Sequence, residues 1–364
     1  MWHHKTRAAA AATLAALILV SVVACSGDRS TSGGRHSQGS FEVGVILPDT
    51  QSSPRYEEQD RPLLQKVFDT AGVTVDIQNA QGDKAKFATI ADAMIQEGVR
   101  VLIVDGLDSP SAAAVEQRAK AAGVTTIDYD RLTLGGSASY YVSFDNVEVG
   151  QLMGKGLVSC LGSNSSARII EVNGSPTDNN ATLFKQGYDQ VLNQRYAAGW
   201  SKVGDQSIPG WDNATAGASF EQMLSAAGGK VDGVLAAWDS GAQAIITVLK
   251  KNGLEVPITG DDATVPGLQS ILRGDQCVTV YKSVRKEAAA AAQLSIALIK
   301  NLPAPPTVEL KDPQTGRMVP SVLLSADAIT KASVKDVIAD GGADYSKVCT
   351  GDVSALCEAA GITR

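Results

Sequence analysis

Polar and aromatic side chains follow many of the short β-rich runs of this 364-residue chain, each at the point where a run ends. Carboxylate, amide and guanidinium groups form paired hydrogen bonds to vicinal hydroxyls, and an indole face covers the C–H face of a pyranose ring. The residues are Arg55, Tyr56, Asp130, Arg131, Asp178, Asn180, Trp211, Trp238, Asp239, Asp262 and Lys282. This set predicts a pocket for a small, neutral, polar ligand.

Two other interpretations of these residues stay open. Asp and Asn favour helix N-caps, so a single acid at a strand end can be purely structural. This is a weaker explanation for Trp211 and Trp238, because tryptophan is not a turn former. Asp239 and Asp262 end different predicted strands and could face each other as the two carboxylates of a glycosidase. Spacing alone gives neither acid a raised pKa, so we expect a binding protein rather than an enzyme.

The composition excludes several kinds of chemistry. All three histidines, His3, His4 and His36, precede residue 40, so the rest of the chain contains no imidazole. It therefore contains no Ser-His-Asp or Cys-His nucleophile and no His-ligated zinc site. The formal net charge of −7 argues against a nucleic-acid surface. Neither a P-loop nor a Gly-x-Gly-x-x-Gly motif at a strand end is present, so we expect no nucleotide cofactor.

The elements that must position these residues alternate from residue 41 onward. Short β-rich runs such as 99–104 precede segments with helical spacing such as 112–121, and many of these segments stop at glycine. This order predicts an α/β fold with parallel sheets covered by helices on both faces. One (β/α)₈ barrel is a possible packing. Two doubly wound lobes are preferred, because the alternation pauses at 132–139 and 303–315.

The first 25 residues have the layout of an export signal. Lys5 and Arg7 precede an uncharged apolar run that ends at Ala24 and is too short to span a membrane comfortably. Ala24 directly before Cys25 resembles a bacterial lipobox, in which the cysteine thiol is acylated. An ordinary secretory signal cut near Ala24 is the alternative. We predict a lipoprotein signal over 1–24 and a flexible Ser/Gly-rich tether over 25–40. Removal of the two basic residues changes the side-chain charge to −7 − 2 = −9.

Export also changes what is expected of the cysteines. With Cys25 acylated, Cys160, Cys277, Cys349 and Cys357 remain, and an oxidising compartment permits two disulfides. Four cysteines allow three pairings. The short separation favours Cys349 with Cys357, which leaves Cys160 for Cys277. Metal binding is the weaker interpretation, because the chain has no CxxC motif and no histidine partner.

Six segments in chain order resemble the D-xylose-binding branch of the bacterial periplasmic sugar-binding proteins. They are Tyr129-Asp-Arg-Leu132, Tyr141-Val-Ser-Phe-Asp-Asn146, Gly174-Ser-Pro-Thr-Asp-Asn-Asn-Ala181, Gly204-Asp-Gln206, Gly260-Asp-Asp-Ala263 and Thr279-Val-Tyr-Lys282. They extend over almost the whole mature chain. The resemblance implies a type I periplasmic binding protein fold with three hinge strands. It also implies capture of a sugar without chemistry and delivery to an ABC permease.

The resemblance implies roles for single residues. Arg55 and Arg131 match arginines that bind sugar hydroxyls, and Tyr56 stands where the family has a stacking tryptophan. Trp211 matches a tryptophan that covers the sugar ring. The remaining matches are polar ligands of the second lobe and the hinge: Asp178, Asn180, Asp262 and Lys282.

The chain departs from the family pattern on both walls of the pocket. Where the family has Asn-Asp-Ala-Thr-Ala, this chain has Trp238-Asp-Ser-Gly-Ala242, so Trp238 replaces an asparagine that binds sugar. Tyr56 is the change on the other wall. A site built for hydroxyls discriminates strongly between hydroxyl patterns. The ligand is therefore left open among a xylose-like pentose, another sugar and a polyol.

The expected organisation is a two-lobed monomer held by its lipid at the extracytoplasmic face of the cell membrane. Residues 41–143 with 283–317 would form the N-terminal lobe, and 144–282 with 318–364 the C-terminal lobe. The lobes would close on the ligand by hinge bending. No cofactor, metal or nucleic-acid partner is expected. A subunit that presents its sugar to a membrane receptor, without transport, remains an alternative.

Overall fold

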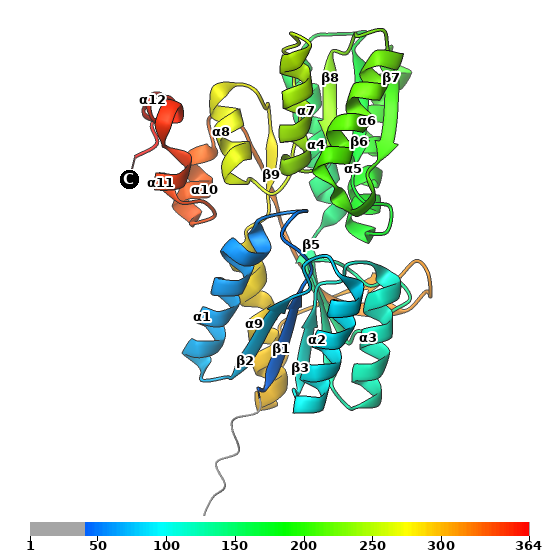
Figure 1. Cartoon of the computed structure of the whole chain (residues 1–364), viewed down its shortest axis with the longest axis vertical. Helices are drawn as coiled ribbons and strands as arrows, with labels where there is room; N and C mark the ends of the chain where they lie inside the picture. Colours follow the sequence, from blue (N-terminus) through cyan, green and yellow to red (C-terminus); the bar gives the residue numbers. More distant parts are fainter. Residues whose placement is uncertain (1–40, 364) are drawn as a thin grey trace, which may run out of the picture. The chain divides into compact units, whose positions relative to one another are not determined.

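The computed structural model describes residues 41–363, so the predicted signal, the tether and Cys25 lie outside the described residues. In the described part, strands and helices alternate as predicted and build separate sheets rather than one closed barrel (Figure 1). No helix within residues 41–363 has both the length and the apolar character needed to cross a bilayer.

A seven-stranded sheet forms the first lobe, with the strand order β10-β11-β5-β4-β3-β1-β2. All neighbouring strands are parallel except β10 and β11. The strands are β1 (Val43–Leu47), β2 (Val75–Asn79), β3 (Val101–Val104), β4 (Thr125–Tyr129), β5 (Tyr140–Phe144), β10 (Val308–Lys311) and β11 (Met318–Leu324). The central strands β1 and β3 are buried along their whole length, as expected for a parallel sheet with two covered faces.

Helices cover both faces of this sheet (Figure 1). They are α1 (Arg61–Ala71), α2 (Lys84–Glu97), α3 (Ser109–Ala121) and α9 (Val284–Lys300). Helices α1 and α9 share one apolar cluster with the strands, and α2 and α3 share another. Local signals fix the helix ends. Asp83 caps α2 by accepting from the backbone N–H groups of Ala85 and Lys86, and Gly98 ends the helix at a φ of 85°.

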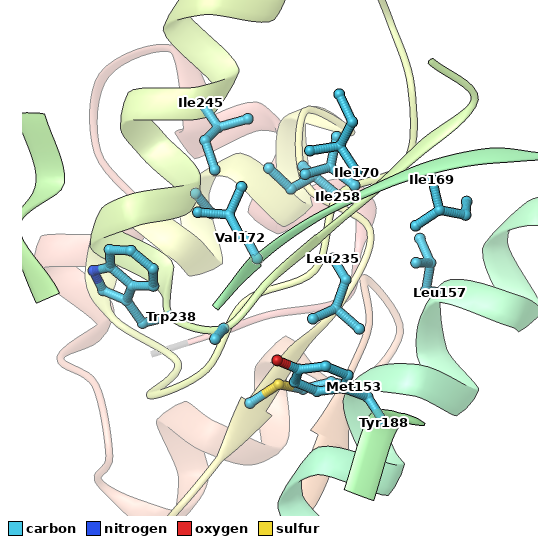
Figure 2. Close-up of a cluster of buried hydrophobic side chains, with 14 of the residues drawn as sticks. Met153, Leu157, Ile169, Ile170, Val172, Tyr188, Leu235, Trp238, Ile245 and Ile258 are labelled. Atoms are coloured by element: carbon cyan, nitrogen blue, oxygen red, sulfur yellow. The ribbon is translucent and has the colours of Figure 1, made fainter. Parts of the chain in front are cut away.

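The second lobe contains a parallel sheet of strand order β7-β6-β8. Its strands are β6 (Arg168–Asn173), β7 (Ser201–Ser207) and β8 (Gly233–Ala236), and β9 (Thr279–Tyr281) pairs separately with β12 (Asp327–Ile329). Its helices are α4 (Asn146–Leu161), α5 (Asn179–Ala197), α6 (Asn213–Ala226), α7 (Asp239–Lys251) and α8 (Val265–Arg273). Figure 2 shows their shared apolar core, in which Met153, Leu157 and Tyr188 pack near Leu235 and Ile258.

One predicted lobe boundary is wrong. Residues from 318 onward were assigned to the second lobe, but β11 lies in the first sheet, where Ser321 is in register with Tyr141 of β5. The chain crosses to the second lobe only after Leu324. The apolar run 318–324 predicts a strand but not its partner. In the structure β11 lies between β5 and β10, and the sequence pattern did not reveal β10.

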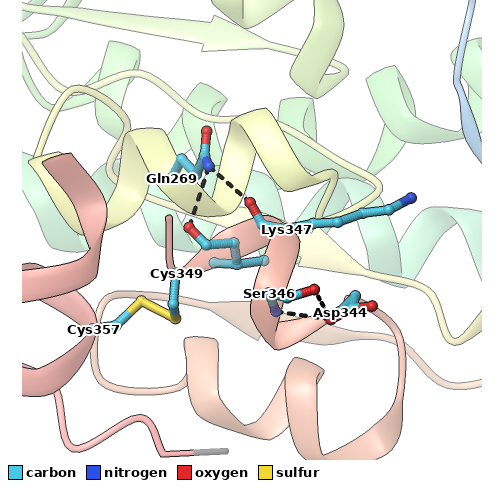
Figure 3. Close-up of a disulfide and its surroundings, with 7 residues drawn as sticks. Gln269, Asp344, Ser346, Lys347, Cys349 and Cys357 are labelled. Atoms are coloured by element: carbon cyan, nitrogen blue, oxygen red, sulfur yellow. Dashed lines mark hydrogen bonds between the residues drawn. A yellow bond between two sulfur atoms is a disulfide. The ribbon is translucent and has the colours of Figure 1, made fainter. Parts of the chain in front are cut away.

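Three short helices, α10 (Val334–Asp340), α11 (Tyr345–Val348) and α12 (Ser354–Ala359), end the described chain and pack against α8. A disulfide joins Cys349 to Cys357 beside them (Figure 3). The Gln269 amide on α8 donates to the backbone carbonyls of Lys347 and Val348. Both disulfides have the pairing expected from the sequence, since Cys160 of α4 is bonded to Cys277.

Candidate functional site

A pocket lies where the carboxyl ends of strands from both lobes meet, the usual ligand position in open α/β sheets. The lining residues are Ser52, Ser53, Tyr56, Asp130, Arg131, Asp178, Asn180, Phe184, Trp211, Trp238, Asp261, Asp262 and Lys282. Every predicted ligand-binding residue except Arg55 and Asp239 is among them. The pocket combines carboxylates, cations and aromatic rings, and these come from both lobes.

Arg131 connects the two walls of the pocket. Its Nε lies 3.1 Å from Asp178 Oδ2 of the second lobe. Its Nη1 donates to the Gly106 carbonyl at 3.1 Å, and its Nη2 donates to the Tyr56 hydroxyl at 3.1 Å. All of these side chains are buried. The planar guanidinium therefore has a fixed orientation, as expected for an arginine that binds vicinal hydroxyls.

Two tryptophans form a corner in the second-lobe wall. The rings of Trp211 and Trp238 are nearly perpendicular, at 81°, with centroids 5.4 Å apart. The Trp211 Nε1 donates to Asp178 Oδ2 at 3.0 Å. Glycines make room for both indoles, because a Cβ on Gly174 would overlap the Trp211 ring and one on Gly241 would overlap the Trp238 ring. The corner thus depends on two residues with no side chain.

Lys282 sits between two acids at the hinge end of β9. Its Nζ lies 2.9 Å from Asp261 Oδ2 and 3.1 Å from Asp262 Oδ1. The same Nζ lies 5.3 Å from the centre of the Phe184 ring, a cation–π distance. Burial raises the pKa of Asp261 to about 8, and the Lys282 charge opposes that rise. Burial lowers the pKa of Lys282, but attraction to Asp261 and Asp262 outweighs it and raises the value.

Three residues that line this pocket have strained backbone conformations. Asp130, Trp211 and Asp262 are not glycines, yet their φ angles are 59°, 56° and 90°. Such left-handed conformations persist only where the surrounding structure enforces them, and they cluster at ligand clamps. The strain therefore supports a functional role for these three residues, independently of their side-chain chemistry.

Arg55 lies behind the lining rather than in it. Its Nε and Nη2 donate to the two carboxylate oxygens of Asp60 at 2.9 Å each, and Nη2 also donates to Glu287. Only Nη1 faces the pocket side, 3.6 Å from Asp130 Oδ1. The sequence prediction of a direct sugar contact missed these partners because Glu287 belongs to α9, far away in the chain. In the structure Arg55 supports Asp130 from behind.

Asp239 also differs from its predicted role. It is fully buried in the first turn of α7, where Oδ2 accepts from the Thr264 backbone N–H at 2.8 Å and Oδ1 accepts from the Gln276 amide at 2.7 Å. Burial raises the pKa of Asp239 to about 7. Its hydrogen bonds hold the segment that follows Asp262. Asp239 therefore does not face the pocket opposite Asp262 as a glycosidase pair would require.

Sequence reasoning left several lining residues out of the predicted site. Asp261 directly precedes Asp262, and Phe184 lies one helical turn after Asn180 on α5, a spacing that places both on one helix face. Ser52 and Ser53 follow β1, where the Asp49 carboxylate accepts hydrogen bonds from the Ser52 N–H and hydroxyl. Adjacency to a predicted residue was the available signal for Asp261 and Phe184. For the two serines the sequence indicated only a turn.

Two α/β lobes with a polar, aromatic-walled pocket at their strand ends define a ligand-binding protein of the type I periplasmic binding protein fold. The sequence model of the family described as "Periplasmic binding protein domain" matches residues 43–303. The chain belongs to this family. Its characterised relatives are substrate-binding proteins of transport systems and not enzymes.

Similar proteins narrow the branch of the family. The D-xylose-binding periplasmic protein of Haemophilus influenzae is 32% identical over 85% of this chain and 92% of that protein. The protein of the same name from Escherichia coli is 33% identical over 82% of this chain and 90% of that protein. A carbohydrate transporter solute-binding protein from Chloroflexus aurantiacus, solved in complex with D-glucose, superposes with a TM-score of 0.78 and 29% identity. It covers 84% of this chain and 98% of its own.

Proposed function

We propose that this protein captures a monosaccharide outside the cytoplasm by closing its two lobes around it, and then delivers the sugar to an ABC permease. The observation that carries the proposal is the pocket itself, in which hydrogen-bonding groups of both lobes meet beside two indoles. The similarity to sugar-binding proteins over most of the chain supports the same ligand class.

Buried polar atoms without a hydrogen-bond partner support a hydroxyl-rich ligand. Among the described residues that line the pocket, such atoms are Asp130 Oδ1 and Asp261 Oδ1, which are both acceptors. Buried polar groups are rarely left unsatisfied in native proteins. A sugar hydroxyl both donates and accepts, so it can satisfy carboxylate and guanidinium groups in one pocket.

Closure would follow from the way the lobes share the ligand. Arg131 and Asp178 already meet at 3.1 Å across the lobes, and the Asn180 amide donates to the Asp130 carbonyl at 3.0 Å. A sugar that bonds to both walls has more contacts in the closed form, so it shifts the equilibrium toward closure. The connecting segments lie between β5 and α4, between β9 and α9, and between β11 and β12.

The proposed function is tested by the melting temperature of the purified protein with D-xylose, D-glucose, L-arabinose, D-ribose, myo-inositol and xylitol. A ligand at a hundred times its Kd stabilises the folded state by about 2.7 kcal/mol, which raises the melting temperature by several degrees. We expect at least one sugar to do so. Asp262→Ala should abolish the shift, whereas Asp352→Ala, at an exposed ion pair with Arg273, should preserve it. If neither these compounds nor the 6-deoxy sugars D-fucose and 6-deoxy-D-glucose raise the melting temperature, the proposal is wrong.

We also propose that acylated Cys25 anchors the mature protein at the extracytoplasmic membrane face. In cells that make the full precursor, the protein should sediment with membranes, and its N-terminal peptide should carry a fatty-acyl mass. Cys25→Ser should release the protein into the soluble extracytoplasmic fraction with its sugar response unchanged. Ser26→Ala is the matched control and should stay anchored. A Cys25→Ser variant that remains on membranes would rule out this anchor.

A further inference from the structure

We propose that Trp238, oriented by Asn213, is the specificity-determining residue of the pocket and selects a sugar whose edge at C5 is apolar. This inference rests on the proposed sugar-binding function and names the kind of sugar. The favoured ligands are pentopyranoses and 6-deoxyhexoses. A hexose with a free 6-hydroxyl is disfavoured.

The polar atom of Trp238 is already engaged away from the ligand. Its Nε1 donates to Asn213 Oδ1 at 2.8 Å. The Asn213 amide in turn donates to the backbone carbonyl of Gln51, in the first lobe, at 3.1 Å. Asn213 is not among the residues that line the pocket, and Trp238 is. The hydrogen bond therefore leaves Trp238 with only its carbon surface to offer to a ligand.

The indole N–H of Trp211 is also hydrogen-bonded within the protein. The Trp211 Nε1 donates to Asp178 Oδ2 at 3.0 Å. Because the two indoles are nearly perpendicular, a flat ring stacked on one of them meets the other at its edge. Neither indole has a free N–H with which to satisfy a hydroxyl there. The polar groups of the pocket belong instead to other lining residues: Ser52, Ser53, Tyr56, Asp130, Arg131, Asp178, Asn180, Asp261, Asp262 and Lys282.

Sugar chemistry identifies which edge fits this corner. In an aldopyranose the ring carbons C1 to C4 all carry hydroxyls, so only C5 can bear an apolar substituent in an unmodified sugar. That substituent is hydrogen in a pentopyranose and methyl in a 6-deoxyhexose. A 6-hydroxyl in the corner would lose water without gaining a partner. An apolar pocket rejects an added hydroxyl by roughly 100-fold at most, so we expect a preference of about 10- to 100-fold.

The test compares dissociation constants within two matched series by isothermal titration calorimetry. One series is D-glucose, 6-deoxy-D-glucose and D-xylose, and the other is D-galactose, D-fucose and L-arabinose. In the wild-type protein the 6-deoxy sugar and the pentose should bind about 10- to 100-fold tighter than the parent hexose in at least one series. The ratio within a series is the readout, because general damage to the pocket weakens all its members together.

Variants test whether the preference depends on an apolar side chain at position 238 or on an indole in particular. Trp238→Phe keeps an apolar wall and should keep the preference. Trp238→Asn supplies an amide that can bond to the 6-hydroxyl, so the ratio should fall to about 1. Asn213→Ala frees the indole N–H and should lower the ratio as well. Trp200→Phe removes an indole whose N–H bonds to the Asn164 carbonyl outside the pocket lining, and is the matched control.

The possible results separate a failure of this inference from a failure of the proposed function. The proposal is overturned if the hexose of each series that binds does so as tightly as its 6-deoxy partner in the wild-type protein. It is also overturned if Trp238→Asn retains the preference while its circular dichroism spectrum and ligand-free melting temperature match those of Trp238→Phe. A protein that binds no member of either series, yet responds to another sugar or a polyol, overturns only this inference. A protein that responds to no sugar or polyol overturns the proposed function as well.

Discussion

Replacing Arg131 by alanine is expected to weaken sugar binding by about 100- to 1,000-fold. The side chain bonds to both lobes at once, through Asp178 on one side and Tyr56 and Gly106 on the other. Its loss removes a cation that lines the pocket and leaves the buried carboxylates of Asp105 and Asp178 without it. An affinity loss of about 100- to 1,000-fold corresponds to about 3–4 kcal/mol, the lower part of the cost of about 3–5 kcal/mol for removing one partner of a buried ion pair.

Calorimetric titration with the sugar that gives the largest thermal shift measures this effect. Arg131→Lys should retain part of the affinity, since it keeps the charge but lacks the planar fork that serves several acceptors. Arg118→Ala is the matched control, because Arg118 is exposed and pairs with Asp92 on the surface. If Arg131→Ala binds within tenfold of the wild-type protein, Arg131 is not a ligand-binding residue.

Arg55→Ala is expected to give the largest loss of stability, about 3–5 kcal/mol in the free energy of unfolding. Arg55, Asp60 and Glu287 are all buried, and the Tyr129 hydroxyl also donates to Asp60. Without the guanidinium, Asp60 and Glu287 lose the one cationic side chain that lies within 4 Å of them among the described residues. Urea denaturation followed by circular dichroism measures the change through the midpoint at constant slope.

Two further variants test the cause of this loss. Glu287→Gln should be milder than Arg55→Ala, because the amide oxygen can still accept from Arg55 and Asp60 keeps its guanidinium partner. Arg100→Ala removes an exposed arginine whose Nη1 is 3.9 Å from Glu42, and surface pairs of this kind contribute at most about 1 kcal/mol. Equal losses for Arg55→Ala and Arg100→Ala would show that burial of the pair is not the cause.

Much of the fold could be predicted from sequence because periodicity and helix stops are local. Residues 61–71 have helical spacing and stop at Gly72, which predicts α1 with its observed limits, and the apolar run 318–324 predicts β11. Helix α8 was missed because its nine residues are short and follow a loop rich in polar side chains. The short run 256–259 also predicts a strand, but in the structure it forms an isolated bridge between Ile258 and Val234. Which strands pair depends on contacts between residues distant in sequence. A sequence pattern does not show these contacts, so the predicted lobe boundary was wrong.

The candidate site was likewise predicted only in part. Most of the lining residues could be predicted, because they directly follow predicted strands or match motifs of the family. Neither feature reveals which way a side chain at a strand end points. Asp239 turns inward because Thr264 and Gln276 supply donors there, and Arg55 is drawn toward Asp60 and Glu287. Asn213 has no signal of its own, since its role depends on the indole that it contacts.

The interrupted first lobe has a consequence for how the chain matures. Its strands β1 to β5 come from the first part of the sequence, but α9 and β11, which cover one face and extend the sheet beside β5, come from the last part. The face covered by α2 and α3 is built from residues 46–124 alone, but the face covered by α1 and α9 is complete only once α9 has been made. The sheet of β6 to β8, by contrast, comes from one continuous stretch. The first lobe therefore needs segments from both ends of the described chain to complete its sheet, whereas the sheet of β6 to β8 needs only one.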